Sequence, residues 1–257
     1  MWFYAIKLYV EENMMKENNY TWDIINKVVN LLNEQDSNCI EIPNITWYRT
    51  RNKKELFYHV NSICALNYEE KGFMFDIAKD GEGEGVILEI GADIGQSAIP
   101  LAMGSKMSNR EKVISIDHDK GGQDYFWERD KRLHSKRHGG RRWEIFIENL
   151  ALCGVEDWVI PIGADSKEAW KYLDVDIRLL YIDGNHDYEH KTNDIINYGK
   201  MLVSKGWIFV HDYFASGIDD ADGSAEETQM AVNELIKDSN MYTDFDVIGT
   251  LAMAKKV

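Results

Sequence analysis

Short apolar runs alternate with amphipathic stretches after residue 85, and this alternation is the strongest constraint on the fold. The apolar runs lie at 86–90, 113–116, 158–162, 177–182 and 207–210, and helix-like segments lie at 95–104, 143–153, 166–173, 188–203 and 225–237. Buried strands that alternate with helices are typical of βαβ units, which build a mostly parallel sheet covered on both faces. The sequence therefore predicts a doubly wound α/β domain over residues 81–257.

The two ends of the chain depart from this alternation. Residues 245–248 and 251–254 flank Gly249-Thr250, a pattern that favours an antiparallel hairpin closing the sheet. Residues 1–80 show helical periodicity instead, and three glycines between positions 80 and 85 separate them from the first strand. We therefore expect an N-terminal helical extension over residues 1–80.

Composition narrows the functional classes. The chain has 257 residues with a net charge of −15, and 44% of its residues are hydrophobic. The apolar content supports a sizeable core, whereas the acidic balance argues against a nucleic-acid binder or a membrane-surface protein. Three widely spaced cysteines form no CxxC pair, and the first residues lack the pattern of a signal peptide. These features favour a cytoplasmic protein.

One segment reverses the acidic charge. Residues 120–142 carry eight Lys and Arg side chains against three acidic ones. This basic segment is either a solvated insertion or a lid that attracts an anionic or polar substrate.

The first apolar run ends in a glycine turn, Glu89-Ile-Gly91-Ala92-Asp93-Ile-Gly95-Gln96-Ser97. A strand that turns through glycine into a helix lets a ligand approach the backbone, and the helix start offers free N–H groups. The G-x-G-x-x-G pattern of dinucleotide sites is absent, and Glu89 and Asp93 would repel a pyrophosphate. The two acids instead suit a ligand with positive groups, such as the sulfonium and ammonium of S-adenosylmethionine.

Acidic residues also follow the next two runs. Asp117 stands at the end of the second run, where a carboxylate can accept hydrogen bonds from both hydroxyls of a ribose. Asp165, in Gly163-Ala-Asp165-Ser166, can accept from an adenine amino group or cap the following helix.

Paired acids and histidines follow the last two runs. They are Asp183 and His186 in Asp183-Gly-Asn-His186, and the adjacent pair His211-Asp212. Because the carboxyl ends of neighbouring parallel strands meet at one crevice, these side chains are predicted to meet there. Asp183 and Asp212 are oxygen ligands of the kind that Mg²⁺ uses, and His186 is placed to act as a general base.

Together these motifs resemble the class I S-adenosylmethionine-dependent methyltransferases over residues 84–257, most closely the branch of metal-dependent macrolide-sugar O-methyltransferases. The resemblance implies a Rossmann-like, seven-stranded sheet and O-methylation of a small polar molecule, a sugar or natural-product hydroxyl. It implies a cofactor site at Glu89, Gly91, Ala92, Asp93, Gly95, Gln96, Ser97, Asp117, Asp165, Ser166 and Asp183.

The resemblance also implies His186 as the catalytic base and a divalent cation, Mg²⁺ or another, at Asp183 and Asp212. His211 departs from that branch, which has a second carboxylate there. Either His211 is a nitrogen ligand, or the site prefers another ion, or it holds none.

Two other classes stay open: an NAD- or nucleotide-binding oxidoreductase, and a binding protein that keeps the fold without catalysis. For residues 1–80 we expect a cap over the methyl-acceptor side of the crevice or a contact within a homo-oligomer. The expectation rests on the aromatic side chains at the start of the chain.

Overall fold

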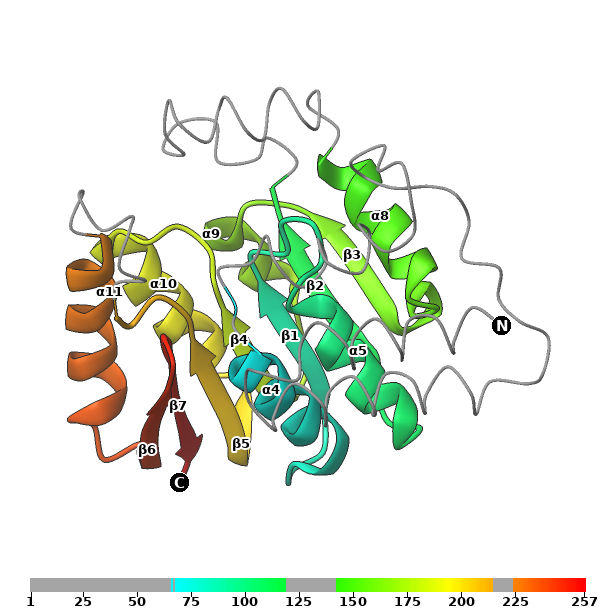
Figure 1. Cartoon of the computed structure of the whole chain (residues 1–257). Coiled ribbons are helices and arrows are strands. Elements are labelled where there is room, and N and C mark those ends of the chain that lie inside the picture. The colour runs from blue at the N-terminus through cyan, green and yellow to red at the C-terminus, as the bar shows by residue number, and fades with distance from the viewer. Residues whose placement is uncertain (1–65, 67, 119–141, 215–223) are drawn as a thin grey trace, which may run out of the picture.

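The computed structural model describes residue 66 and residues 68–118, 142–214 and 224–257 (Figure 1). Residues 1–65 and 67, most of the segment expected to form a cap or oligomer contact, lie outside this part, as does all of the basic segment except Arg142.

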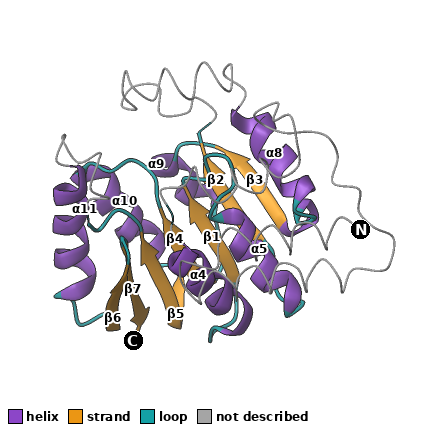
Figure 2. Cartoon of the chain, in the orientation of Figure 1, coloured by secondary structure: helices purple, strands orange, loops and turns teal. Residues whose placement is uncertain are grey.

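Seven strands form one mixed sheet in the order β3-β2-β1-β4-β5-β7-β6, as Figure 2 shows in orange. β1 to β5 pair in parallel, whereas β7 is antiparallel to both β5 and β6. The bounds are β1 Val86–Ile90, β2 Val113–Asp117, β3 Val159–Gly163, β4 Ile177–Ile182, β5 Leu202–Val210, β6 Tyr242–Ile248 and β7 Leu251–Lys256. The predicted Rossmann-like sheet with a closing hairpin is confirmed.

Helices cover both faces of the sheet. The described α-helices are α4 Tyr68–Asp80, α5 Ala98–Met107, α8 Arg142–Leu152, α9 Ser166–Ala169, α10 Tyr188–Gly199 and α11 Ser224–Val232. Short helical turns follow as η2 Glu156–Trp158, η3 Trp170–Tyr172 and η4 Asn233–Lys237. No helix in these described ranges is long and apolar enough to span a membrane.

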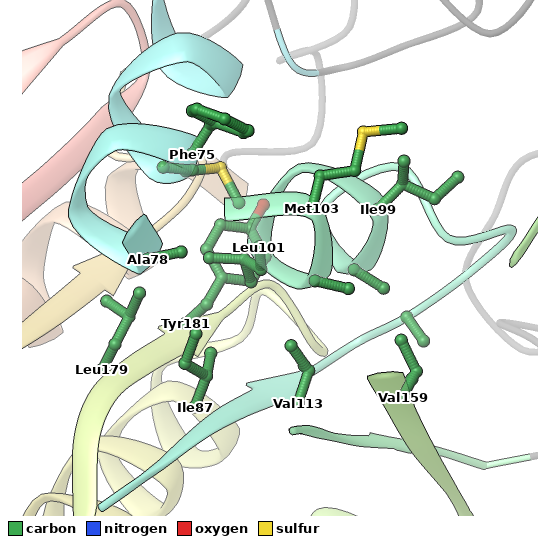
Figure 3. Packing of buried hydrophobic residues seen from close by; sticks show 14 of the residues in the cluster. Phe75, Ala78, Ile87, Ile99, Leu101, Met103, Val113, Val159, Leu179 and Tyr181 are labelled. Atoms are coloured by element: carbon green, nitrogen blue, oxygen red, sulfur yellow. The ribbon is translucent and has the colours of Figure 1, made fainter. Parts of the chain in front are cut away.

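Alternating strand residues divide the core into two layers. On one face, Ile87 and Leu179 pack with residues of α4, α5 and α8, as Figure 3 shows for part of this layer. On the other face, Leu88 and Leu180 pack with residues of α9, α10 and α11. Because successive strand side chains point to opposite faces, the two layers follow from the unbroken apolar runs.

The predicted helix over 188–203 is wrong at its C-terminal end. α10 stops at Gly199, and β5 begins at Leu202, five residues before its predicted start. A Cβ at Gly199 would lie 2.8 Å from the Tyr242 hydroxyl, and Lys256 Nζ donates to the carbonyls of both Gly199 and Leu202. The helix therefore ends where the C-terminal hairpin packs against it.

A buried arginine joins α4 to the sheet. The fully buried Arg178 of β4 donates to the carbonyls of Ile77 and Ala78 in the last turn of α4 and pairs with Glu111. The guanidinium thus satisfies the Ala78 carbonyl at the end of the helix and shares the Ile77 carbonyl with the Gly81 amide. α4 is therefore anchored to the same sheet that carries the polar strand ends.

Candidate active site

The predicted polar residues meet at the carboxyl edge of the parallel strands. The glycine turn follows β1, and Asp117 is the last residue of β2. Asp183 is the first residue after β4, and His211 is the first residue after β5. Backbone hydrogen bonds tie these ends together, from Gly91 N to Ile116 O at 2.9 Å and from His211 N to Ile182 O at 3.0 Å. The motifs therefore meet at one edge of the sheet, as the sequence predicts.

Gly91 is required by the loop after β4. Its φ is +88°, and a Cβ there would lie 2.1 Å from the carbonyl oxygen of Asp183. The Asp183 amide in turn donates to Ile90 O at 2.8 Å. A side chain at residue 91 would therefore push the glycine turn away from the acidic loop, so backbone packing by itself requires glycine here.

Glu89 points into the protein. The side chain is fully buried, and its two carboxylate oxygens accept hydrogen bonds from the hydroxyls of Ser97 and Ser115. Burial raises the pKa of Glu89 to about 7, because the two hydroxyl hydrogen bonds offset only part of the desolvation. Glu89 and Ser97 thus stabilise the glycine turn from the protein interior. A direct contact of either residue with the cofactor stays a prediction.

Asp117 accepts a hydrogen bond from the backbone of the same glycine turn. Its Oδ2 accepts from the Asp93 amide at 2.8 Å, and Asp93 has a φ of +43°. Beside it, Ala92 is buried, and Gln96 Oε1 is buried with no hydrogen-bond partner among the described residues. A buried oxygen of this kind indicates a donor that the described residues do not supply.

Asp165 caps α9. Its side chain accepts from the Lys167 amide at 2.9 Å, while the Ser166 carbonyl accepts from the Tyr198 hydroxyl at 2.8 Å. A Cβ on the neighbouring Gly163 would meet nothing within 4 Å. The capping role of Asp165 is therefore present, and a Cβ at Gly163 would face open space among the described residues.

Two carboxylates and a histidine gather at the ends of β4 and β5. Asp183, His186 and Asp212 each offer a ligand atom within 4.8 Å of the others. His186 Nε2 lies 3.0 Å from Asp212 Oδ2 and 3.8 Å from Asp183 Oδ1. Tyr181 also donates to Asp183 Oδ2 at 3.0 Å, and Asp212 has a φ of +59°. Backbone strain of this kind is common at functional sites.

His211 lies behind these carboxylates and is fully buried. Its Nδ1 is 3.4 Å from Asp183 Oδ1 and 3.2 Å from Asp212 Oδ2, within ion-pair distance but without hydrogen-bond geometry to the described residues. His186, in contrast, is 21% exposed. His186 therefore approaches the carboxylates from the solvent-exposed side, and His211 approaches them from the protein interior.

Charge pairing dominates the pKa values of this cluster. Burial opposes ionisation of every member, but the imidazoles hold the pKa of Asp183 below, and that of Asp212 well below, the usual range. Hydrogen bonds to the two carboxylates likewise raise the pKa of His186 against the effect of burial, and their charges raise that of His211 well above its usual range. The two carboxylates thus favour a positively charged group between them.

Sequence reasoning missed Glu70 and Thr250. Glu70, in the first turn of α4, is fully buried and accepts from Thr250 N at 2.7 Å and from Thr250 Oγ1 at 3.0 Å. Thr250 Oγ1 also lies 2.9 Å from His211 Nε2. An isolated glutamate on a helix and a threonine in a hairpin turn carry no sequence signal for this contact.

Comparison with known proteins gives a family and a fold. Residues 88–213 match the family model described as a methyltransferase domain. A search of curated proteins gives no significant match.

Solved structures share the fold at low identity. The O-methyltransferase NovP is 15% identical with a TM-score of 0.57, and the match covers 77% of this chain and 83% of NovP. Cofactor-bound Rv0187 from MTB is 15% identical with a TM-score of 0.56, covering 98% and 95%. SAH-bound PaMTH1, a methyltransferase from Podospora anserina, is 18% identical with a TM-score of 0.55, covering 98% and 94%.

The matched range, 88–213, begins within β1 and ends just after Asp212, so it contains the glycine turn, Asp117 and the cluster of Asp183, His186 and Asp212. Residues 88–213 of the chain therefore match a methyltransferase domain, and solved methyltransferase structures share the fold of the chain.

Proposed function

We propose that this protein transfers the methyl group of S-adenosylmethionine to a hydroxyl oxygen of a small polar molecule. The observation that carries the proposal is the contact of Gly91 with the Asp183 backbone. It sets the predicted cofactor turn directly against the cluster of Asp183, His186 and Asp212. A donor group and a reactive cluster held side by side supply the proximity that transfer requires.

The cofactor side fits the donor in charge and shape. Asp117 offers a carboxylate for the ribose hydroxyls, and the open space above Gly163 accommodates a flat base beside Asp165 and Ser166. Gln96 Oε1 can accept a hydrogen bond from the bound cofactor. The turn of Glu89, Gly91, Ala92, Asp93, Gly95 and Ser97, together with Asp183, completes the proposed cofactor site.

The donor set of the cluster fits a divalent cation. Asp183 and Asp212 supply oxygens, and His211 directs Nδ1 at both of them from the buried side. Such an ion supplies Lewis acidity, which makes an alcohol a better nucleophile at neutral pH. Asp183, Asp212 and His211 are therefore the residues that would hold it.

His186 is the proposed general base, because exposure separates the two histidines. Only His186 is open to the crevice and can contact a methyl acceptor, since His211 is fully buried. As the O–CH₃ bond forms and the S–CH₃ bond breaks, the hydroxyl proton passes to the His186 imidazole. Asp212, 3.0 Å from Nε2, stabilises the imidazolium that results.

Calorimetry and a product assay test this function together. We expect the purified protein to bind S-adenosylmethionine and not NAD, and to release S-adenosylhomocysteine when supplied with hydroxylated small molecules such as sugars and phenols. Chelation should abolish turnover, and a divalent cation should restore it. Binding of NAD in place of S-adenosylmethionine would support the oxidoreductase alternative and overturn the proposal. Cofactor binding without methylation of any hydroxyl would favour a non-catalytic binding protein.

A further inference from the structure

The buried side of the acidic cluster continues into a chain of polar contacts. His211 faces the two carboxylates with Nδ1 and faces Thr250 with Nε2. Behind Thr250 stands Glu70, whose Oε2 is 3.9 Å from the same Nε2. The chain joins the first turn of α4, the β6–β7 hairpin and the end of β5, which lie far apart in the sequence.

The hydrogen-bond roles in this chain are fixed by what each group can donate. A carboxylate of Glu70 only accepts, so the single hydroxyl hydrogen of Thr250 is directed at Glu70 Oε1. Thr250 Oγ1 can then only accept from His211, and this places a hydrogen on Nε2. The nitrogen that remains to bind a ligand is Nδ1.

Nδ1 is also the atom of His211 that makes no hydrogen bond to the described residues. It is buried, with no hydrogen-bond partner among the described residues, yet it lies 3.2 and 3.4 Å from one oxygen each of Asp212 and Asp183. Two carboxylates facing this nitrogen favour a positive charge between them, which a proton on Nδ1 or a metal cation that displaces the proton would supply. A histidine that donates its other N–H to a backing group is typical of metal ligands.

We infer that Glu70 and Thr250 are positioning residues that fix the tautomer of His211, so that its Nδ1 serves as a nitrogen ligand beside Asp183 and Asp212. The inference rests on the proposed function, because it refines the metal site described there. It goes beyond that function in naming the residues that orient the ligand and in predicting a mixed nitrogen and oxygen donor set. Such a set favours Mn²⁺, Fe²⁺ or Co²⁺ over Mg²⁺, which prefers oxygen alone.

Mn²⁺ binding to the full-length protein tests the inference without reference to turnover. Mn²⁺ affinity is measured by electron paramagnetic resonance of the free ion, and nitrogen coordination is measured by electron spin-echo modulation. We expect the wild-type protein to show nitrogen coupling to bound Mn²⁺ and to bind Mn²⁺ more tightly than Mg²⁺. Thr250→Val and Glu70→Gln should each weaken Mn²⁺ binding roughly 10–100-fold, the usual effect of removing a group that orients a metal ligand.

Three further variants separate orientation from mere stability. Thr250→Ser keeps the hydroxyl and should retain wild-type affinity. Glu111→Gln removes a half-buried partner of Arg178 at the opposite end of α4, so it should lower the melting temperature without changing Mn²⁺ affinity. Nitrogen coupling should vanish in His211→Asn and persist in His186→Asn.

Several results would overturn the inference: no Mn²⁺ binding by the wild-type protein, nitrogen coupling that survives in His211→Asn, or unchanged affinity in Thr250→Val. Its failure is distinguishable from failure of the proposed function. Methyl transfer by a wild-type protein that binds no Mn²⁺ refutes the inference alone. The predicted Mn²⁺ pattern without methylation of any hydroxyl refutes the proposed function alone.

Discussion

On the β1–β2 side of the crevice, the protein itself occupies the carboxylates: Glu89 accepts from Ser97 and Ser115, and Asp117 accepts from the Asp93 amide. On the β4–β5 side, the Tyr181 hydroxyl donates to Asp183, but Asp183 and Asp212 also share two imidazoles. Hydrogen bonds from neutral groups hold the glycine turn in one conformation, whereas paired charged groups can exchange a proton or bind a cation. The first side is therefore expected to govern binding, and the second to govern rate.

The largest effect is expected at His186. Replacing His186 with Asn should lower kcat by roughly 10²–10⁴-fold, because a positioned base is lost, while affinity for S-adenosylmethionine stays close to wild type. Steady-state kinetics and calorimetry on the same samples check both halves. His190→Asn is the matched control, since His190 pairs with Asp187 outside the cluster, and it should keep full activity. A His186→Asn enzyme with most of its activity would move the base elsewhere.

A second prediction uses the pH dependence of stability. The pKa of Glu89 is about 7 in the folded protein and about 4.5 when exposed, so folding favours its protonated form. The free energy of unfolding should therefore lose up to about 3 kcal/mol from Glu89 as pH rises from about 4.5 through 7.

Glu89→Gln should lack that loss, because its side chain does not ionise. The difference in unfolding free energy between variant and wild type, from urea titrations at several pH values, should grow in favour of the variant toward pH 8. A difference that stays constant with pH would show that Glu89 is already ionised without cost.

The third expected effect concerns Asp117. Asp117→Ala should weaken S-adenosylmethionine binding about 10–100-fold, because hydrogen bonds to a charged acceptor contribute about 1.5–3 kcal/mol. Asp117→Asn keeps an oxygen for the Asp93 amide, so it separates the loss of charge at the ribose from collapse of the turn. Calorimetric affinity unchanged in both variants would remove Asp117 from the site.

The smallest effect is expected at Gly163. Its Cβ position is empty, so Gly163→Ala should change the unfolding free energy by no more than about 0.5 kcal/mol. If an adenine lies above this residue, the same methyl group should still reduce cofactor affinity. An alanine variant with unchanged affinity would place the base elsewhere, while a large loss of stability would contradict the open space.

The order of elements was predictable because each strand end carries its own signal. The apolar runs fixed five strand positions, and Gly249-Thr250 marked the hairpin. The start of β5 was not predictable, since Ser204, Lys205 and Gly206 interrupt its apolar pattern and Lys205 has a φ of +64°. A local irregularity of this kind is set by pairing with β4, which residue type does not encode.

The site was predictable only in the parts that follow strands directly. Asp117, Asp183, His186 and Asp212 were found because topology brings strand ends together. The inward orientation of Glu89 depends on two serines from other segments. Glu70 lies 180 residues before Thr250, and nothing local to either residue indicates their contact.

The hydrogen bonds of Arg178 to the last turn of α4 predict how far the chain can be truncated from its N-terminus. A shortened protein that begins at residue 81 would leave this guanidinium buried without the Ile77 and Ala78 carbonyls. Arg178 would keep its ion pair with Glu111, but the apolar layer would also lose Met74, Phe75 and Ala78 of α4. The shortest form that folds by itself is therefore expected to start before Tyr68, where α4 begins.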